Sequence, residues 1–447
     1  MNQLAVKSRP LNPARVLALG FMGLILSGSL LLLLPPMTEG SGIAYIDALY
    51  TAASAVCVTG LVVVDTGTFY TPLGQGVIMF LIFCGSLGFM TMATLIFVFL
   101  GRKITLRDRL LVREALNQDS VAGLVRLVLT VVKMAIFFIL LGTIAMSIRF
   151  VPQLGIGRGI FFSLFHSVSA FGNAGFDIFG NYTSLTLTPT DYLVNGTIMV
   201  LFIIGGLGFT VILELIGHFR HRERISLHSR LVLMISLVLL VGGTLMVLTL
   251  EYNNPATMGA LPAGGKVFTA LFTAATPRTA GFSVLNTAAL TYPTLLILMG
   301  LMFIGASPTS TGGGVKTTTF GIVFFTFLNM IRGRQEPVVF SRVFSLSQIM
   351  KAISIMSAAI ALIFVATFVM TIFEDHEFSA LLFEAFSAFG TVGLSRGITP
   401  DLSSASKIAL ILTMFGGRIG PLTLMVALAR RREADVLHYP EEHILIG

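Results

Sequence analysis

Long hydrophobic runs alternate with short polar connections along almost the whole chain. A helix needs about 20 apolar residues to cross a bilayer, and most of these runs have that length. They cover residues 16–34, 77–100, 127–148, 198–216, 231–250, 295–304, 353–372 and 408–429. The run that starts at Leu295 stops early. The pattern predicts an all-α membrane protein with eight transmembrane helices.

A shorter amphipathic segment lies within each successive pair of runs. These segments cover residues 47–56, 158–170, 266–275 and 378–388, and Asp47 is a candidate N-cap for the first. They are too short to span a bilayer, which is typical of re-entrant helices. Irregular backbone at membrane depth has to be enclosed by protein or line a wet cavity. We therefore expect the loops that follow these segments to meet at the centre.

Each amphipathic segment ends in a loop of small residues that closes with a glycine and a hydrophobic residue. The four glycines are 115, 106 and 112 residues apart, so the chain divides into four similar units. Four such loops around one axis make a ring of backbone carbonyls, which is how potassium is selected. The predicted filter residues are Val58, Thr59 and Gly60, Asn173, Ala174 and Gly175, Thr279, Ala280 and Gly281, and Thr391, Val392 and Gly393.

The predicted organisation is four tandem helix–pore helix–loop–helix units, arranged with pseudo-four-fold symmetry around one pore. The expected segments are a cytoplasmic N-terminus (1–15), pore unit one (16–100), pore unit two with its preceding cytoplasmic loop (101–217), pore unit three (218–331), pore unit four (332–430) and a cytoplasmic tail (431–447).

Unit three is interrupted halfway across the membrane by a polar stretch at residues 305–316. Its glycines, its proline and its hydroxyl residues cannot continue an α-helix. A simple kink would need one proline or glycine and not twelve residues. This position, just under the glycine loops, predicts a gate formed by Gly305, Ser307, Thr309, Ser310, Thr311, Gly312, Gly313, Gly314 and Lys316.

Two cations, Lys316 and Arg418, lie in the middle of predicted spans. A central cation costs about 3 kcal/mol or more and usually has a functional or pairing reason. Either Arg418 projects into the ion path as a barrier and a tether for the 305–316 loop, or it only binds backbone carbonyls. Arg278 in the third loop would block cations if it faced the path, so we expect it to pack behind the filter.

Composition indicates the class of protein, and charge indicates the orientation of the chain in the membrane. The chain is 55% hydrophobic and 11% charged, far from the soluble norm. Of its 29 Lys and Arg, 20 lie in the termini and in alternate loops. By the positive-inside rule both termini are cytoplasmic and the glycine loops enter from outside. This rule accounts for the basic balance, so we expect no nucleic-acid partner. The two cysteines, both in apolar segments, imply no disulfide framework.

The four loops, the 305–316 stretch and the sequence Gly-Arg-Ile-Gly-Pro-Leu-Thr at 417–423 together resemble the Trk/Ktr/HKT superfamily of cation transporters. The resemblance covers essentially the whole chain and is closest to the membrane subunit of the bacterial Ktr potassium-uptake system (KtrB type). It implies a homodimer in the plasma membrane, potassium as the substrate and no covalent cofactor. It also implies a soluble cytoplasmic nucleotide-binding regulatory ring (KtrA type), which would carry the nucleotide.

The leading functional hypothesis is potassium uptake that is channel-like, with stimulation by sodium left open. The alternative is a sodium-permeable or poorly selective cation transporter. Within the superfamily a serine in the first loop goes with sodium transport, and the glycine in all four loops here favours potassium. An inverted-repeat carrier would have halves of opposite orientation, whereas these units share one. We do not expect the protein to be an enzyme, because the sequence has no paired intramembrane carboxylates and no combination of serine and histidine suited to nucleophilic catalysis.

Overall fold

The computed structural model describes residues 13–424 except 41, 89–90, 93, 96–123, 223, 335 and 422. The described part is almost entirely helical, and its one sheet is a two-stranded hairpin of β1 (Val338–Val339) and β2 (Arg342–Val343). The expected cytoplasmic tail, most of the expected N-terminus and the loop at 101–123 lie outside the described residues.

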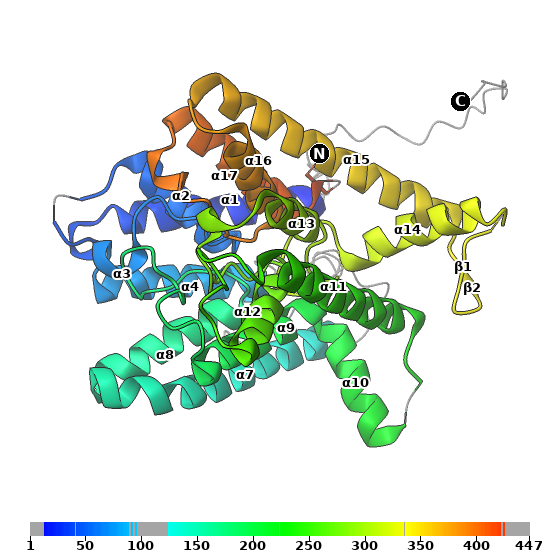
Figure 1. The fold of residues 1–447 in the computed structure, drawn as a ribbon, viewed down its shortest axis with the longest axis horizontal. Coiled ribbons are helices and arrows are strands. Elements are labelled where there is room, and N and C mark those ends of the chain that lie inside the picture. Colours follow the sequence, from blue (N-terminus) through cyan, green and yellow to red (C-terminus); the bar gives the residue numbers. More distant parts are fainter. Residues whose placement is uncertain are drawn as a thin grey trace, which may run out of the picture.

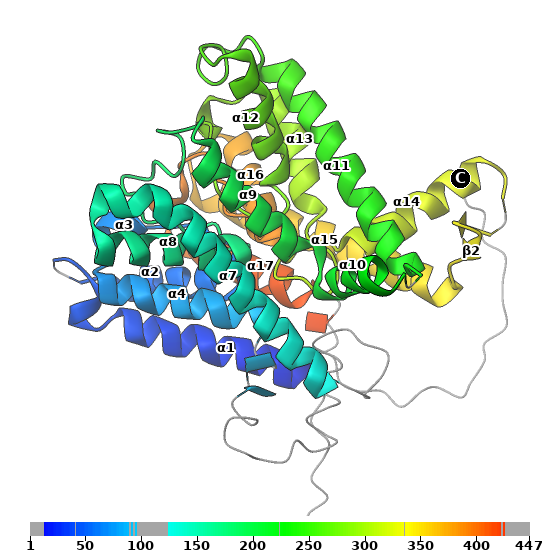
Figure 2. The ribbon, with the colours of Figure 1, turned by 90° about the horizontal axis from the view of Figure 1, so that it is seen from below.

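The described helices repeat one pattern four times: an outer helix, a short pore helix, a loop and an inner helix (Figures 1 and 2). The outer helices are α1 (Pro13–Leu32), α7 (Leu124–Leu154), α11 (Leu227–Glu251) and α15 (Leu346–Phe373). The pore helices are α2 (Tyr45–Val56), α8 (Ile156–Phe171), α12 (Ala263–Ala275) and α16 (Phe378–Gly390). The inner helices are α4 (Pro72–Leu87), α9 (Tyr192–Leu207), α13 (Tyr292–Phe303) and α17 (Ser404–Ile419).

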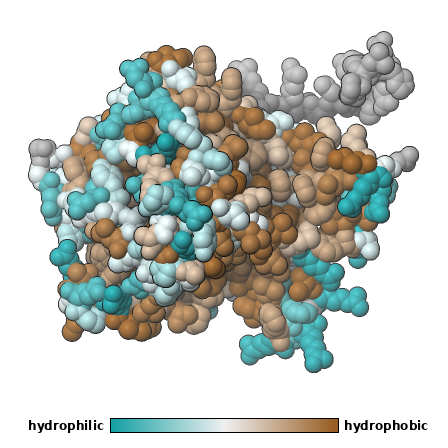
Figure 3. Space-filling view, viewed as in Figure 1, coloured by the Kyte–Doolittle hydropathy of each residue, from teal (hydrophilic) through white to brown (hydrophobic). Residues whose placement is uncertain are grey.

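Further helices connect or extend these units. They are α3 (Thr66–Phe69), α10 (Phe209–His221), α14 (Thr317–Ile331) and the 3-10 turns η1 (Pro35–Met37), η2 (Thr287–Ala289) and η3 (Thr399–Asp401). Among the described residues the four outer helices are each long and apolar enough to cross a bilayer. Hydrophilic residues gather at the end of the molecule near α3 and again at α10 and the hairpin, with hydrophobic surface between them (Figure 3). This band is what a multi-pass membrane protein presents to lipid.

The expected continuous span at 198–216 is wrong. The helix stops at Leu207, and α10 leaves α9 at an angle of 97°. Gly208 has a φ of +94°, a conformation that glycine adopts without steric cost and that ends an α-helix. Gly88 and Gly420, at the matching places after α4 and α17, have φ values of +84° and +95°. The inner helices of units one, two and four therefore end at equivalent glycines.

A second set of glycines brings each of these inner helices against its pore helix. A Cβ added at Gly85 would lie 2.1 Å from the carbonyl oxygen of Val56. At Gly205 it would lie 2.1 Å from that of Phe171, and at Gly417 it would lie 1.9 Å from that of Phe389. Larger residues cannot fit there. The repeated glycine motifs thus serve both close packing and helix termination.

Polar residues at the helix starts explain where several helices begin. Asp191 caps α9, Ser226 caps α11 and Ser403 caps α17, each accepting a hydrogen bond from a backbone N–H in the first turn. The expectation that Asp47 caps α2 is wrong, because the helix begins at Tyr45. Asp47 instead lies in the first turn, where the helix dipole favours a carboxylate, and its Oδ1 accepts from Lys407 Nζ at 2.7 Å.

A ring of four glycine loops as the candidate functional site

The four loops after the pore helices share one pattern of positive φ values. Each has a positive φ at the filter glycine and another two residues earlier. The pairs are Val58 at 52° and Gly60 at 88°, Asn173 at 56° and Gly175 at 69°, Thr279 at 74° and Gly281 at 79°, and Thr391 at 50° and Gly393 at 94°. Three of the four earlier residues are β-branched, for which a positive φ is an outlier. Such strain costs about 1–3 kcal/mol per residue and clusters at functional sites.

The loops approach one another in a closed ring, in chain order. A Cβ added at Gly60 would lie 2.4 Å from the carbonyl oxygen of Ala174, and one at Gly175 would lie 2.9 Å from that of Ala280. The ring continues from Gly281 to the carbonyl oxygen of Val392 at 2.3 Å. It closes from Gly393 to that of Thr59, also at 2.3 Å. The middle residue of each loop therefore directs its carbonyl group toward a neighbouring loop's glycine.

Hydroxyl groups at the ends of the pore helices hold each loop. Ser54 Oγ accepts from Gly60 N at 3.0 Å, and Ser387 Oγ accepts from Gly393 N at 3.1 Å. Ser169 Oγ donates to the carbonyl oxygen of Phe176 at 2.6 Å, and Thr276 Oγ1 donates to that of Phe282 at 2.7 Å. These braces were not predicted from the sequence. Their signal was a serine six residues before the glycine in units one, two and four.

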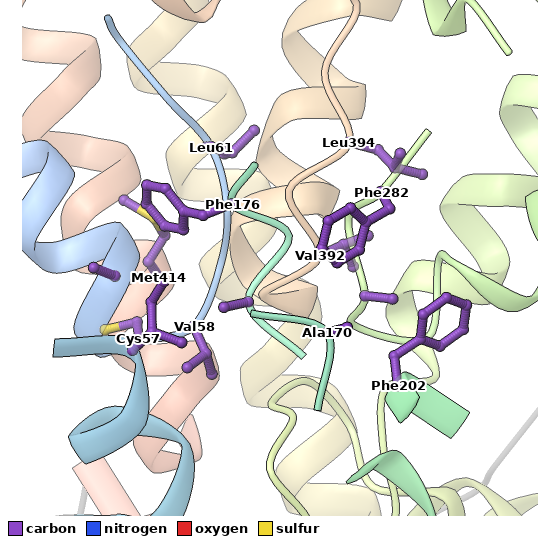
Figure 4. Close-up of a cluster of buried hydrophobic side chains, with 14 of the residues drawn as sticks. Cys57, Val58, Leu61, Ala170, Phe176, Phe202, Phe282, Val392, Leu394 and Met414 are labelled. Carbon is purple, nitrogen blue, oxygen red and sulfur yellow. The ribbon is translucent and has the colours of Figure 1, made fainter. Parts of the chain in front are cut away.

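The hydrophobic residue after each glycine anchors the outer end of the loop. Leu61, Phe176, Phe282 and Leu394 are all buried, at 3% exposure or less. Figure 4 shows these side chains on four loop segments that run side by side. Burial of one large apolar side chain contributes about 1.5–3 kcal/mol, which offsets the strain at the positive-φ positions.

The 305–316 loop lies directly beneath this ring and binds its inner residues. Thr311 Oγ1 donates to Asn173 Oδ1 at 3.0 Å, and Asn173 Nδ2 donates to Thr279 Oγ1 at 3.0 Å. Gly313 N donates to Thr391 Oγ1 at 3.0 Å. The inner filter residues of units two, three and four thus form one hydrogen-bonded network with the loop. Val58, the apolar residue at this place in unit one, is buried.

The same loop also binds the free carbonyl ends of two inner helices. Ser307 N and Thr311 N donate to the carbonyl oxygens of Gly206 and Gly205 at 3.0 and 3.2 Å. Gly314 N donates to the carbonyl oxygen of Gly417 at 3.2 Å. The last carbonyls of a helix have no partner within it, and here the loop satisfies them.

The remaining predicted gate residues hold the loop's own shape. Gly305 N donates to the carbonyl oxygen of Val315 at 2.9 Å, and Ser310 Oγ donates to that of Ser307 at 2.6 Å. Lys316 precedes α14, and its Nζ donates to the carbonyl oxygen of Gly312 at 2.6 Å. Gly312 has no room for a side chain, since a Cβ there would lie 2.1 Å from Thr279 Oγ1.

Arg418 joins the loop to unit one. Its guanidinium donates to the carbonyl oxygens of Thr311 and Gly85, and to that of Ser86 at 3.1 Å. A cavity of about 490 Å³ lies next to it, with Thr309, Gly312, Lys316 and Arg418 among its lining residues. Arg418 therefore binds backbone carbonyls and also borders the space below the ring, so the two roles weighed from the sequence are compatible.

Other polar residues near the ring have supporting positions. His166 Nε2 accepts from Ile178 N at 3.3 Å, and its Nδ1 lies 2.7 Å from the carbonyl oxygen of Phe162. Glu384 accepts from Thr399 Oγ1 at 3.2 Å. Arg278 lines a separate, mostly apolar cavity of about 190 Å³ between α9 and α11, in agreement with packing behind the filter. No cluster of three metal-ligating side chains occurs among the residues that the structure describes.

The fold and this ring define a multi-pass membrane protein built around four similar glycine loops. The TrkH family, whose description is "Cation transport protein", matches residues 21–438. The chain is 44% identical to Ktr system potassium uptake protein B of Bacillus subtilis over 97% of both chains. It is 41% identical to the protein of the same name from Vibrio alginolyticus, over 97% of this chain and 94% of that one.

The chain is also 37% identical to the potassium/sodium uptake protein NtpJ of Enterococcus hirae, over 98% of both chains. Its fold matches the crystal structure of the potassium transporter TrkH from Vibrio parahaemolyticus with a TM-score of 0.71 at 20% identity, covering 96% of this chain and 87% of that one. The chain belongs to the TrkH family of cation transport proteins, as a Ktr-type membrane subunit. This confirms the resemblance seen in the sequence, and the family is one of transporters and not of enzymes.

Proposed function

We propose that the protein takes up potassium through the ring of four glycine loops, in a channel-like manner. The observation that carries this proposal is the repeated pair of positive-φ residues in loops that close on one another in chain order. Carbonyl groups arranged around one axis replace the hydration shell of a potassium ion. Two relatives that share more than 40% of their residues with this chain are named potassium uptake proteins.

The charge distribution around the ring supports a cation as the substrate. The pore helices α2, α8, α12 and α16 all end at the ring with their C-termini. The C-terminal end of a helix carries about half a negative charge, which stabilises a cation nearby. The proposed filter residues are the twelve named above, from Val58 to Gly393.

The proposed gate is the 305–316 loop together with Arg418. Thr311 is bound at once by Arg418, which donates to its carbonyl oxygen, and by the filter residue Asn173. A guanidinium beside the path repels potassium more strongly in a low-dielectric cavity than in water. Opening then requires the loop and the guanidinium to leave the space under the ring.

The assembly and the location are proposed on the family likeness. We propose a homodimer in the plasma membrane with both termini in the cytoplasm, regulated by a soluble nucleotide-binding ring of the KtrA type. Nucleotide belongs to that partner, and potassium is the transported ion. The proposed organisation into units at 16–100, 101–217, 218–331 and 332–430 places the loop at 305–316 in the third.

Sodium permeation is the second candidate function, because one similar protein is named a potassium/sodium uptake protein. The test of both is uptake by potassium-starved cells that lack their own transporters, with and without sodium. Potassium selection predicts growth and uptake at low potassium, with little sodium entry. Equal entry of sodium and potassium would favour the second candidate, and no uptake of either would contradict the proposal.

A further inference from the structure

Helix α10 runs across the direction of the inner helix α9, which precedes it. It leaves α9 at 97°, and Figure 1 shows α10 projecting sideways from the bundle, whereas α11 runs back along the outside of the bundle. A helix at a right angle to a spanning helix lies close to the plane of the membrane. By the positive-inside rule, the basic residues that follow α10 indicate that its C-terminal end lies at the cytoplasmic surface.

The surface of α10 is that of an interfacial helix. Ile216 is 48% exposed and Phe219 is 83% exposed. Arg220, Arg222 and Arg224 are exposed and form no ion pair with any residue that the structure describes. Figure 3 shows hydrophilic surface gathered at the free end of α10. Apolar side chains next to exposed cations on a helix that lies flat are typical of binding to a membrane surface.

The opposite end of α10 contacts the proposed gate. Phe209 N donates to the carbonyl oxygen of Thr309 at 2.9 Å, and the hydroxyls of Thr210 and Thr309 lie 2.9 Å apart. A Cβ added at Gly208 would lie 2.4 Å from the carbonyl oxygen of Pro308. A change in the position of α10 therefore acts directly on the 305–316 loop.

We propose that α10 and the arginines at 220–224 form a binding site for anionic phospholipid headgroups of the cytoplasmic leaflet, and that its occupancy biases the 305–316 loop through Thr210. The anionic surface of the cytoplasmic leaflet attracts surface cations such as these arginines, and Phe219 supplies the apolar contact. A soluble acidic protein would match the charge but not an apolar side chain on a helix in the membrane plane. The coupling rests on the proposed gate, whereas the lipid site does not.

The lipid site is tested by fluorescence in the full chain, which contains no tryptophan. Phe219→Trp, reconstituted in vesicles, should be quenched more strongly by brominated phosphatidylglycerol than by brominated phosphatidylcholine. High salt and the pair Arg220→Gln/Arg222→Gln should abolish this preference. The matched control is Arg332→Gln/Arg334→Gln, an exposed pair of the same spacing after α14, which should retain it.

Quenching without headgroup preference, or equal loss in both arginine pairs, would overturn the lipid site. Protection of the introduced tryptophan in Phe219→Trp by a soluble protein partner, without quenching by lipid, would assign the surface to a protein and also overturn it.

The coupling is tested by potassium flux in vesicles with and without phosphatidylglycerol. We expect the anionic lipid to change the flux of the wild-type chain and of Thr210→Ser by about fivefold. The flux of Thr210→Val should lose this dependence. The double variant Thr210→Val/Phe219→Trp should still be quenched by the brominated anionic lipid. An unchanged lipid dependence in Thr210→Val would contradict the coupling. If Arg418→Gln leaves the flux unaltered, the proposed gate fails, while the quenching result still decides the lipid site.

Discussion

At the scale of the residue, backbone conformation explains the four glycines. Each filter glycine has a positive φ, and each faces a carbonyl oxygen of a neighbouring loop too closely for a side chain. An L-residue pays about 1–2 kcal/mol for the left-handed conformation alone. The short contacts add to this cost, so the loop has to move outward to accept any side chain.

Substitution of a filter glycine should therefore weaken potassium selection. We expect Gly60→Ser, Gly175→Ser, Gly281→Ser and Gly393→Ser each to lower apparent potassium affinity about tenfold, which corresponds to about 1.4 kcal/mol. Discrimination against sodium should fall with it. Concentration-dependent uptake of both ions measures the two effects, with Gly196→Ser, where a Cβ meets nothing, as the control. Unchanged affinity and selectivity in all four variants would contradict the filter assignment.

The serine braces should act on the same property more mildly. Ser54→Ala and Ser387→Ala remove the acceptors of the Gly60 and Gly393 N–H groups. A buried N–H without a partner costs about 1–3 kcal/mol. We expect reduced potassium-over-sodium selectivity in both, measured by competition uptake. Selectivity should be unchanged in Ser354→Ala, whose hydroxyl donates to the carbonyl oxygen of Met350 in its own helix. Equal effects in all three would count against a role for the braces.

At the scale of the element, the 305–316 loop interrupts a helix and so frees backbone and side-chain polar groups to bind other elements. Its polar groups are used by four neighbours: the inner filter residues, α9, α17 and Arg418. Arg418 in turn binds the carbonyl oxygens of Gly85 and Ser86 in unit one. The loop and Arg418 thus connect all four units beneath the ring.

Loosening this connection should raise the flux and leave selectivity nearly unchanged. We expect deletion of residues 309–313, or Arg418→Gln, to increase the maximal potassium flux several-fold, and Arg149→Gln on an exposed ion pair to have no effect. Arg418→Lys keeps the charge but loses the planar fork of donors. For Arg418→Lys we expect a flux between those of the wild type and Arg418→Gln. The rise above the wild type measures the lost tethering, and the difference from Arg418→Gln measures the retained charge repulsion.

The measurement is initial uptake rate at saturating potassium, normalised to folded protein in the membrane. Lower transport in both the deletion and Arg418→Gln, from protein that folds and inserts normally, would make the loop and the arginine structural supports and not a gate.

Sequence periodicity located the outer helices and the pore helices because their apolar patterns are long or regular. It missed the end of α9, because the apolar run continues past Leu207 as far as Ile216, within α10. Only the φ of Gly208 marks the turn. The predicted filter residues do meet in one ring, since the repeat fixed their register. The partners of Asn173 and Arg418 lie more than 80 residues away, and no local pattern could name them.

At the scale of the whole molecule, the structure has four similar units around one ring, and we propose that the basic loops and termini form its cytoplasmic face. We expect the purified chain to be a dimer in mild detergent, with twice the mass of one chain by light scattering. Replacing Arg430, Arg431 and Arg432, or removing residues 441–447, which all lie outside the described part, should weaken dimerisation or regulatory-partner binding. A fully active monomer that needs no soluble partner would argue against this assembly.

Selection of potassium by the four-loop ring can be tested through the membrane potential of vesicles that contain the purified chain and hold opposed potassium and sodium gradients. We predict a potential that follows the potassium gradient and collapses toward zero in Gly281→Ser, as sodium begins to permeate. A wild-type potential that responds equally to both gradients, or a selective potential that survives in Gly281→Ser, would contradict the claim.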